Sequence, residues 1–63
     1  MKYIYVFDYT FNHIYEVKVK EEEFSAIKNI EGWLFKNYSI DCEHSCEYMV
    51  SNKKLEIETI EKV

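Results

Sequence analysis

The spacing of apolar residues changes near Lys20, and this change restricts the possible folds more than any other feature of the sequence. Between His13 and Lys20 apolar and charged side chains alternate, which predicts a strand with one buried and one exposed face. Beyond Glu21 the apolar residues recur every three or four positions, which predicts a helix with one apolar face. The chain therefore combines strands with a helix.

Another strand precedes the alternating one, because residues 3–9 are almost entirely aromatic or β-branched. One face of this strand carries Tyr3, Tyr5, Phe7 and Tyr9, and the other carries Ile4 and Val6. Residues 10–12 are typical of a turn, since Asn12 tolerates left-handed backbone geometry. We therefore expect residues 3–9 and 13–20 to form an antiparallel hairpin.

The helix is expected to begin at the acidic run 21–23, since negative charge is favourable at a helix N-terminus. Its apolar face comprises Phe24, Ala26, Ile27, Ile30, Trp33, Leu34 and Tyr38. Gly32 is its weak point, because glycine costs roughly 1 kcal/mol in a helix interior, and an early end of the helix there is the alternative. Residues 39–45 are polar or small and predict a loop.

The C-terminal part of the chain has the pattern of a second hairpin. Residues 46–50 have strand character, and Asn52-Lys53 suits a two-residue turn. Pairing around this turn sets Val50 opposite Leu55, Tyr48 opposite Ile57 and Cys46 opposite Thr59 on one face. The same register places Glu47 opposite Glu58, a like-charge pair that is unfavourable unless solvent or a cationic partner meets it.

The predicted fold class is α+β with the order β-β-α-β-β, a four-stranded antiparallel sheet with one helix packed on one face. Residues 1–63 form a single domain. A domain this small buries only about 60% of the surface of its unfolded chain, so a further source of stability is expected. The two cysteines lie too close in sequence to close a long loop, which makes a homodimer or higher oligomer the expected source.

Composition argues against several classes of function. The formal net charge is −4, and the absence of arginine weighs against direct nucleic-acid binding. With one glycine the chain has none of the glycine-rich phosphate loops, and we expect no enzymatic activity. No signal peptide opens the chain and no apolar run approaches the roughly 18 residues of a membrane span, so we expect a cytoplasmic protein that binds no membrane.

One loop concentrates the potential metal ligands. Cys42, His44 and Cys46 would supply three zinc ligands, and His13 would have to supply the fourth from across the fold. Structural zinc sites usually use two separated pairs of ligands, so a polar loop with one half-buried cysteine is the alternative. A redox pair is disfavoured because the spacing is not that of a C-x-x-C motif. We expect no cofactor, with zinc as the exception to test.

The candidate binding residues are aromatic or acidic. They are Tyr3, Tyr5, Phe7 and Tyr9 on the first strand, and Glu47, Glu56 and Glu58 in the second hairpin. A contiguous exposed apolar patch on a small monomer usually marks an interaction site, and acidic side chains suit a basic partner surface. The first hypothesis is therefore a protein-binding inhibitor or adaptor.

The overall profile resembles the small acidic proteins with which phages of low-GC hosts block bacterial defence systems, as anti-defence or anti-CRISPR-like proteins. The resemblance rests on length, net charge and the abundance of residues with AT-rich codons. It implies a host defence protein or another nucleic-acid-binding protein as the partner. Two alternatives are a sponge that sequesters a nucleotide-like signalling molecule at a subunit interface, and a structural metal protein organised by Cys42, His44 and Cys46.

Overall fold

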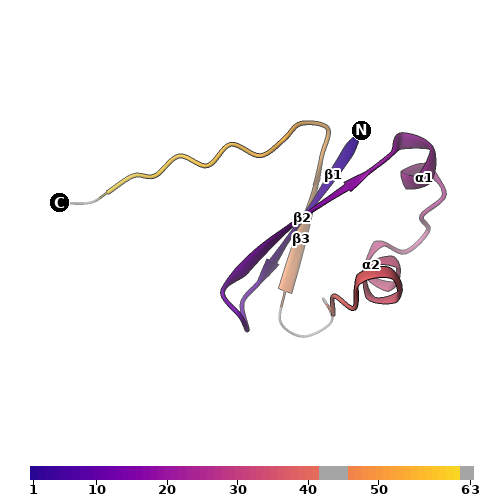
Figure 1. Ribbon diagram of the computed structural model, residues 1–63, viewed down its shortest axis with the longest axis horizontal. Coiled ribbons are helices and arrows are strands. Elements are labelled where there is room, and N and C mark those ends of the chain that lie inside the picture. The colour runs from indigo at the N-terminus through magenta and orange to yellow at the C-terminus, as the bar shows by residue number, and fades with distance from the viewer. Residues whose placement is uncertain (42–45, 62–63) are drawn as a thin grey trace.

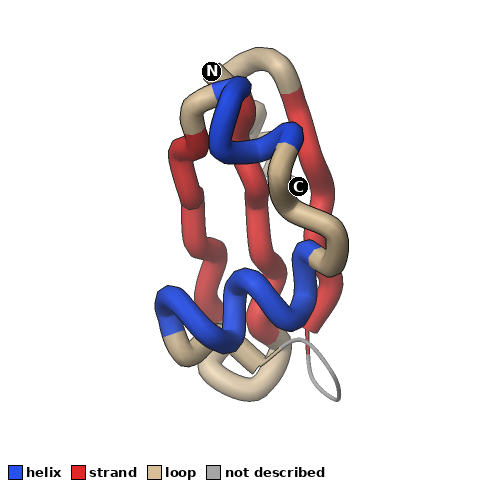
Figure 2. Tube along the Cα trace, turned by 90° about the vertical axis from the view of Figure 1, so that its right-hand side faces the viewer, coloured by secondary structure: helices blue, strands red, loops and turns tan. Residues whose placement is uncertain are grey.

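A computed structural model describes residues 1–41 and 46–61 of the chain. The elements in chain order are β1 (Lys2–Asp8), β2 (His13–Val19), α1 (Glu21–Ser25), α2 (Ile30–Tyr38) and β3 (Cys46–Ser51), as Figure 1 shows. The strands form one antiparallel sheet in the order β2-β1-β3. Both helices lie on the same face of this sheet (Figure 1 and Figure 2), and no helix of the described residues lies on the opposite face.

This architecture corrects the predicted one. The expected four-stranded sheet with a single helix is wrong: the described residues form a three-stranded sheet and two helices. The strands predicted at residues 3–9, 13–20 and 46–50 are present as β1, β2 and β3, whereas residues 54–61 pair with no strand in the described part of the chain. The fold remains a small α+β fold.

The hairpin of β1 and β2 forms as predicted, and its turn has a clear local cause. The Asp8 side chain accepts hydrogen bonds from the backbone N–H groups of Thr10 (3.0 Å) and Phe11 (3.3 Å). Asn12 then takes a left-handed conformation with φ 54°, which asparagine tolerates better than most residues. These contacts fix the register in which Asp8 faces His13 and Lys2 faces Val19.

Two short helices replace the single predicted helix, because the chain stops and restarts between Ser25 and Ile30. Ala26 is the C-cap of α1, and Asn29 is the N-cap of α2. The Asn29 side chain accepts a hydrogen bond from the backbone N–H of Gly32 (3.2 Å). An asparagine at this position satisfies one of the free N–H groups of a helix start. Gly32 therefore lies in the first turn of α2 and does not end a helix.

The core lies between the helices and the sheet. Its buried side chains are Ile4, Val6, Val17, Val19 and Leu34, with Tyr15, Phe24, Ile27, Ile30, Trp33 and Ile40 packed around them. Burying a large aliphatic side chain contributes about 1.5–3 kcal/mol, so these few residues supply most of the available stabilisation. The apolar residues between positions 24 and 34 thus pack against the sheet as predicted, but they come from two helices and the segment between them. No helix in the described ranges has the length and apolar character needed to cross a bilayer.

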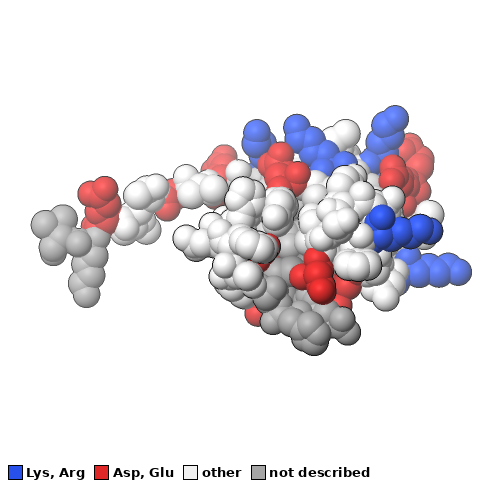
Figure 3. Space-filling model, turned by 60° about the horizontal axis from the view of Figure 1, so that its bottom comes forward, with Lys and Arg blue, Asp and Glu red and all other residues white. Residues whose placement is uncertain are grey.

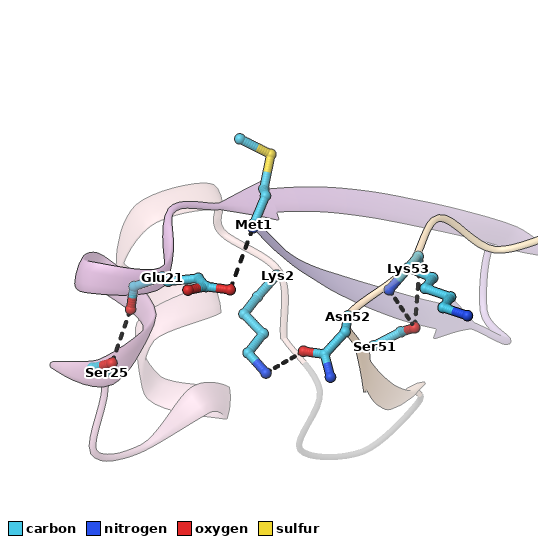
Figure 4. Close-up of polar contacts among 7 residues, drawn as sticks. All are labelled: Met1, Lys2, Glu21, Ser25, Ser51, Asn52 and Lys53. Atoms are coloured by element: carbon cyan, nitrogen blue, oxygen red, sulfur yellow. Dashed lines mark hydrogen bonds and ion pairs between the residues drawn. The ribbon is translucent and has the colours of Figure 1, made fainter.

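The chain leaves β3 through a bend that prevents the predicted second hairpin. The Ser51 hydroxyl accepts a hydrogen bond from the Lys53 N–H (3.1 Å) and donates one to the Lys53 carbonyl (2.9 Å), while Lys2 binds the Asn52 side chain (Figure 4). At the same end of the sheet, where β1 begins and β3 ends, the Met1 amino group lies 3.6 Å from a carboxylate oxygen of Glu21.

Residues beyond this bend extend away from the sheet, as the yellow end of the ribbon in Figure 1 shows. The Leu55 N–H donates to the Tyr5 hydroxyl at 2.6 Å, which draws the chain over the helix-free face and away from the edge of β3. The predicted pairing would also have set Glu47 against Glu58, two like charges. Residues 54–61 are therefore an extended segment, in which Ile57 and Ile60 are 76% and 84% exposed.

Candidate functional site

The face of the sheet opposite the helices is the candidate site, and strand register defines its members. Residues paired across antiparallel strands point to the same side of a sheet. This helix-free face consists of Tyr3, Tyr5 and Phe7 from β1, Ile14, Glu16 and Lys18 from β2, and Glu47, Met49 and Ser51 from β3. It therefore combines an apolar middle with a charged border.

The apolar middle is open to solvent. Tyr3 and Phe7 are half-buried in the central strand, while Ile14 is 48% and Met49 is 39% exposed on the strands beside it. The rings of Tyr3 and Tyr5 are stacked, with centroids 6.2 Å apart and planes 12° apart. Rigid aromatic rings and a flexible methionine side by side are well suited to contact with another protein.

Tyr5 lies on this face but is not available to a partner, because it is only 2% exposed. Its hydroxyl donates to the Glu16 carboxylate (3.0 Å) and accepts from the Leu55 N–H (2.6 Å). Burial raises the pKa of the Tyr5 phenol, the adjacent Glu16 raises it further, and the Leu55 N–H acts in the opposite direction. Tyr5 is thus a neutral anchor that joins β1, β2 and the extended segment.

The structure separates the other predicted binding residues. Glu47 lies on the helix-free face beside Phe7, its partner in the register. Tyr9 lies in the turn after β1, 65% exposed, and so falls outside this face. Glu56 and Glu58 are exposed in the extended segment that leaves the sheet. The face therefore brings together Tyr3, Tyr5, Phe7 and Glu47 from the predicted set, and of these Tyr5 is buried.

The two apolar members of the outer strands, Ile14 and Met49, were not among the predicted binding residues, and neither were Glu16, Lys18 and Ser51. Both could have been found from strand alternation, since Ile14 shares the parity of Glu16 and Lys18, and Met49 shares that of Glu47. An apolar residue on the polar side of an alternating strand is the signal that distinguishes them.

The predicted metal ligands lie mostly beyond the described residues. Cys42 and His44 fall outside them, and Cys46 begins β3 with a side chain that is not described. His13 begins β2, where its ring packs against that of Tyr15 with centroids 4.6 Å apart. Within residues 1–41 and 46–61 no group of three potential ligands is placed to hold a metal ion. A zinc site at Cys42, His44 and Cys46 remains a prediction.

A groove of about 580 Å³ follows the outer edge of β2. One wall is formed by Tyr15 to Lys18 of this strand, and the other by Tyr38 to Asp41, which follow or end α2. The turn residues Thr10 and Phe11 close one end. The lining mixes aromatic rings with the carboxylates of Asp8, Glu16 and Asp41 and the single amine of Lys18.

Comparison of the chain with protein-family models, with curated proteins and with solved structures finds no match. The helix-free face and the groove beside β2 are therefore interpreted from their own chemistry.

Proposed function

We propose that this protein acts by binding another protein, as a non-enzymatic inhibitor or adaptor, and that the helix-free face is its contact surface. The observation that carries the proposal is the apolar middle of this face, where Ile14 and Met49 are exposed beside the half-buried Tyr3 and Phe7. A small monomer rarely leaves such residues contiguous and open to water unless they bind something. The helices cover the other face, and the extended segment contacts this face at Tyr5 through Leu55, which leaves Ile14 and Met49 exposed.

The charges around the apolar middle favour a basic partner. Glu16 and Glu47 flank it on the two outer strands, and the extended segment adds the exposed carboxylates of Glu56 and Glu58. Lys18 is the single cation of the face. With a formal net charge of −4, association with a lysine- or arginine-rich surface is also favoured at long range.

An acidic surface meets the basic groove of a nucleic-acid-binding protein as phosphate groups do. The resemblance of the chain to small acidic phage proteins agrees with such a target. We therefore propose that the partner is a nucleic-acid-binding protein of a bacterial defence system and that this protein occupies its basic groove.

The test is capture of the partner by tagged protein from a host lysate, followed by variants of the face. Ile14→Asp combined with Met49→Asp should abolish capture, because both place charge in the apolar middle. Glu47→Lys should weaken it and reduce its dependence on salt. Phe35→Asp is the matched control, since Phe35 is 60% exposed on α2 and lies outside the helix-free face.

Circular dichroism of each variant checks that the sheet is retained. If Phe35→Asp abolishes capture as strongly as Ile14→Asp with Met49→Asp does, the assignment of this face is wrong. Capture that survives both changes on the face would contradict it as well, and would place the contact elsewhere.

The groove beside β2 provides a second candidate, a sponge for a nucleotide-like molecule. Phe11, Tyr15 and Tyr38 line it and could stack on a base. Its carboxylates outnumber its amine, however, and would repel phosphate groups. Native mass spectrometry of protein purified from its host distinguishes the two: added mass that is released on denaturation supports the sponge, and an apo protein supports the protein-binding function.

A further inference from the structure

The extended segment, residues 54–61, has the sequence of a strand without a strand partner among the described residues. Leu55, Ile57 and Thr59 alternate with Glu56 and Glu58, which is the pattern of a half-exposed strand. Eight extended residues span about 26 Å at roughly 3.3 Å per residue. Ile57 nevertheless remains 76% exposed. The free energy of burying this side chain is therefore still available for association.

The sheet also offers an open place for a strand at the outer edge of β2. This strand ends the sheet in the order β2-β1-β3, so half of its backbone N–H and C=O groups point outward. The groove of about 580 Å³ runs along the same edge, between residues 15–18 and the end of α2. A strand added here would gain backbone hydrogen bonds from β2 and would bury side chains against the groove.

Charge selects the register between this edge and the extended segment. Antiparallel pairing of Val19 with Ile57 sets Lys18 opposite Glu58 and Lys20 opposite Glu56. Both ion pairs then lie on one side of the sheet and the two apolar residues on the other. Figure 3 shows acidic side chains along the extension, whereas lysines and further acidic side chains lie together on the body of the molecule. At the edge of β3, the register of the predicted hairpin would bring Glu58 opposite Glu47, a like-charge pair.

We propose that residues 56–61 of one copy add as a fourth strand to the edge of β2 in a second copy, and that two copies exchange these strands reciprocally. The groove and the edge lie outside the apolar middle of the helix-free face, so Ile14→Asp with Met49→Asp tests the proposed function separately, although Lys18, Glu56 and Glu58 take part in both proposals. A symmetric exchange of identical segments is a low-cost route to a dimer.

The anchor at Tyr5 favours a second copy over the same chain. Leu55 binds the Tyr5 hydroxyl, and that hydroxyl also binds Glu16. Lys20 lies four residues beyond Glu16, roughly 13 Å farther along β2. Glu56 directly follows Leu55 and so cannot face Lys20 of its own chain while the anchor holds.

The first experiment measures the dimer dissociation constant by sedimentation equilibrium on the full-length chain. Lys18→Glu with Lys20→Glu should raise it roughly tenfold or more, since two attractive pairs become repulsive. Glu56→Lys with Glu58→Lys should raise it similarly. The variant with all four changes should restore dimerisation, because both pairs are then attractive again. These four residues are exposed, so the fold tolerates the changes.

A monomeric wild-type protein at every concentration would overturn the proposal. A dimer that the two charge-reversed variants leave unchanged, or that the four-fold variant fails to restore, would overturn it as well.

A second experiment tests whether Lys18 of one copy lies opposite Glu58 of the other, by forming a disulfide between two copies. In both copies Cys42 and Cys46 are first replaced by serine. One copy carries Lys18→Cys and the other, mass-labelled, carries Glu58→Cys. Mild oxidation should join the two copies covalently. In the control, Lys36→Cys replaces Lys18→Cys, because Lys36 is exposed on α2 and lies outside the proposed pairing. This control should give little disulfide-linked dimer.

A single chain that carries both Lys18→Cys and Glu58→Cys shows whether the strand pairs with β2 of its own copy or of the other copy. Disulfide-linked dimers support exchange between copies. A monomer closed by its own disulfide would show that the segment folds back on its own β2 and would overturn the proposal.

Discussion

Replacing Leu34 by alanine should remove a large part of the stability of this fold. Leu34 is fully buried, and from α2 it contacts the sheet residues of the core cluster. The substitution deletes three carbon atoms, worth about 2.4 kcal/mol at roughly 0.8 kcal/mol each. The cavity left behind adds to this loss, so the total should fall within the usual range of about 2–5 kcal/mol for such a change.

That loss is large relative to the whole. A chain of 63 residues has an unfolding free energy of about 3–9 kcal/mol at the usual value per residue. The variant should therefore unfold at a much lower urea concentration, with little change in the slope of the transition. Fluorescence of Trp33, which packs at the border of the core, and circular dichroism should report the transition together. Equal chain concentrations keep any contribution from self-association constant.

Phe35→Ala is the matched control for this measurement. It deletes more carbon atoms than Leu34→Ala, from the next position of the same helix, but Phe35 is 60% exposed. Its cost should stay below about 1 kcal/mol, because little apolar surface is returned to water. If Phe35→Ala proves as costly as Leu34→Ala, or if the latter costs less than about 1 kcal/mol, the packing of α2 on the sheet described above is wrong.

Three further predictions concern single hydrogen bonds. Tyr5→Phe should speed hydrogen exchange at the Leu55 amide by freeing the extended segment, whereas Tyr3→Phe should leave that rate unchanged. Because burial raises the pKa of Tyr5 in the folded chain, the contribution of Tyr5 to stability should be constant below about pH 10 and should be lost as pH rises through the raised pKa. Urea unfolding between about pH 9 and 11 measures this decline, which Tyr5→Phe should flatten. Asn29→Ala should cost about 1 kcal/mol by removing the cap of α2, while Asn29→Asp should preserve most of it, as thermal unfolding of both would show.

Local sequence determined the first half of the fold. The alternation in residues 13–20 and the β-branched run in residues 3–9 specified two strands, because side chains on successive strand residues point to opposite sides. Asp8 and Asn12 supplied the turn between them through contacts within a few residues. The face shared by Tyr3, Tyr5 and Phe7 followed from the same alternation, and so did the core positions Ile4 and Val6.

Tertiary structure decided what local pattern left open. Helical spacing at residues 24–34 was correct, but it did not reveal that Asn29 would start a second helix, since two short helices and one long helix can present the same apolar residues to a sheet. Alternation at residues 55–59 predicted a strand, yet a strand needs a partner edge, and the Ser51 bend together with the Tyr5 hydroxyl directs these residues away from β3.

The burial of Tyr5 was decided in the same way. The sequence determined which side of β1 this tyrosine occupies, because that depends only on its position in an alternating strand. Its loss of contact with water depends on Glu16 and Leu55, which lie 11 and 50 residues away along the chain. Contacts between residues so distant in sequence leave no local pattern, and only the folded chain brings them together.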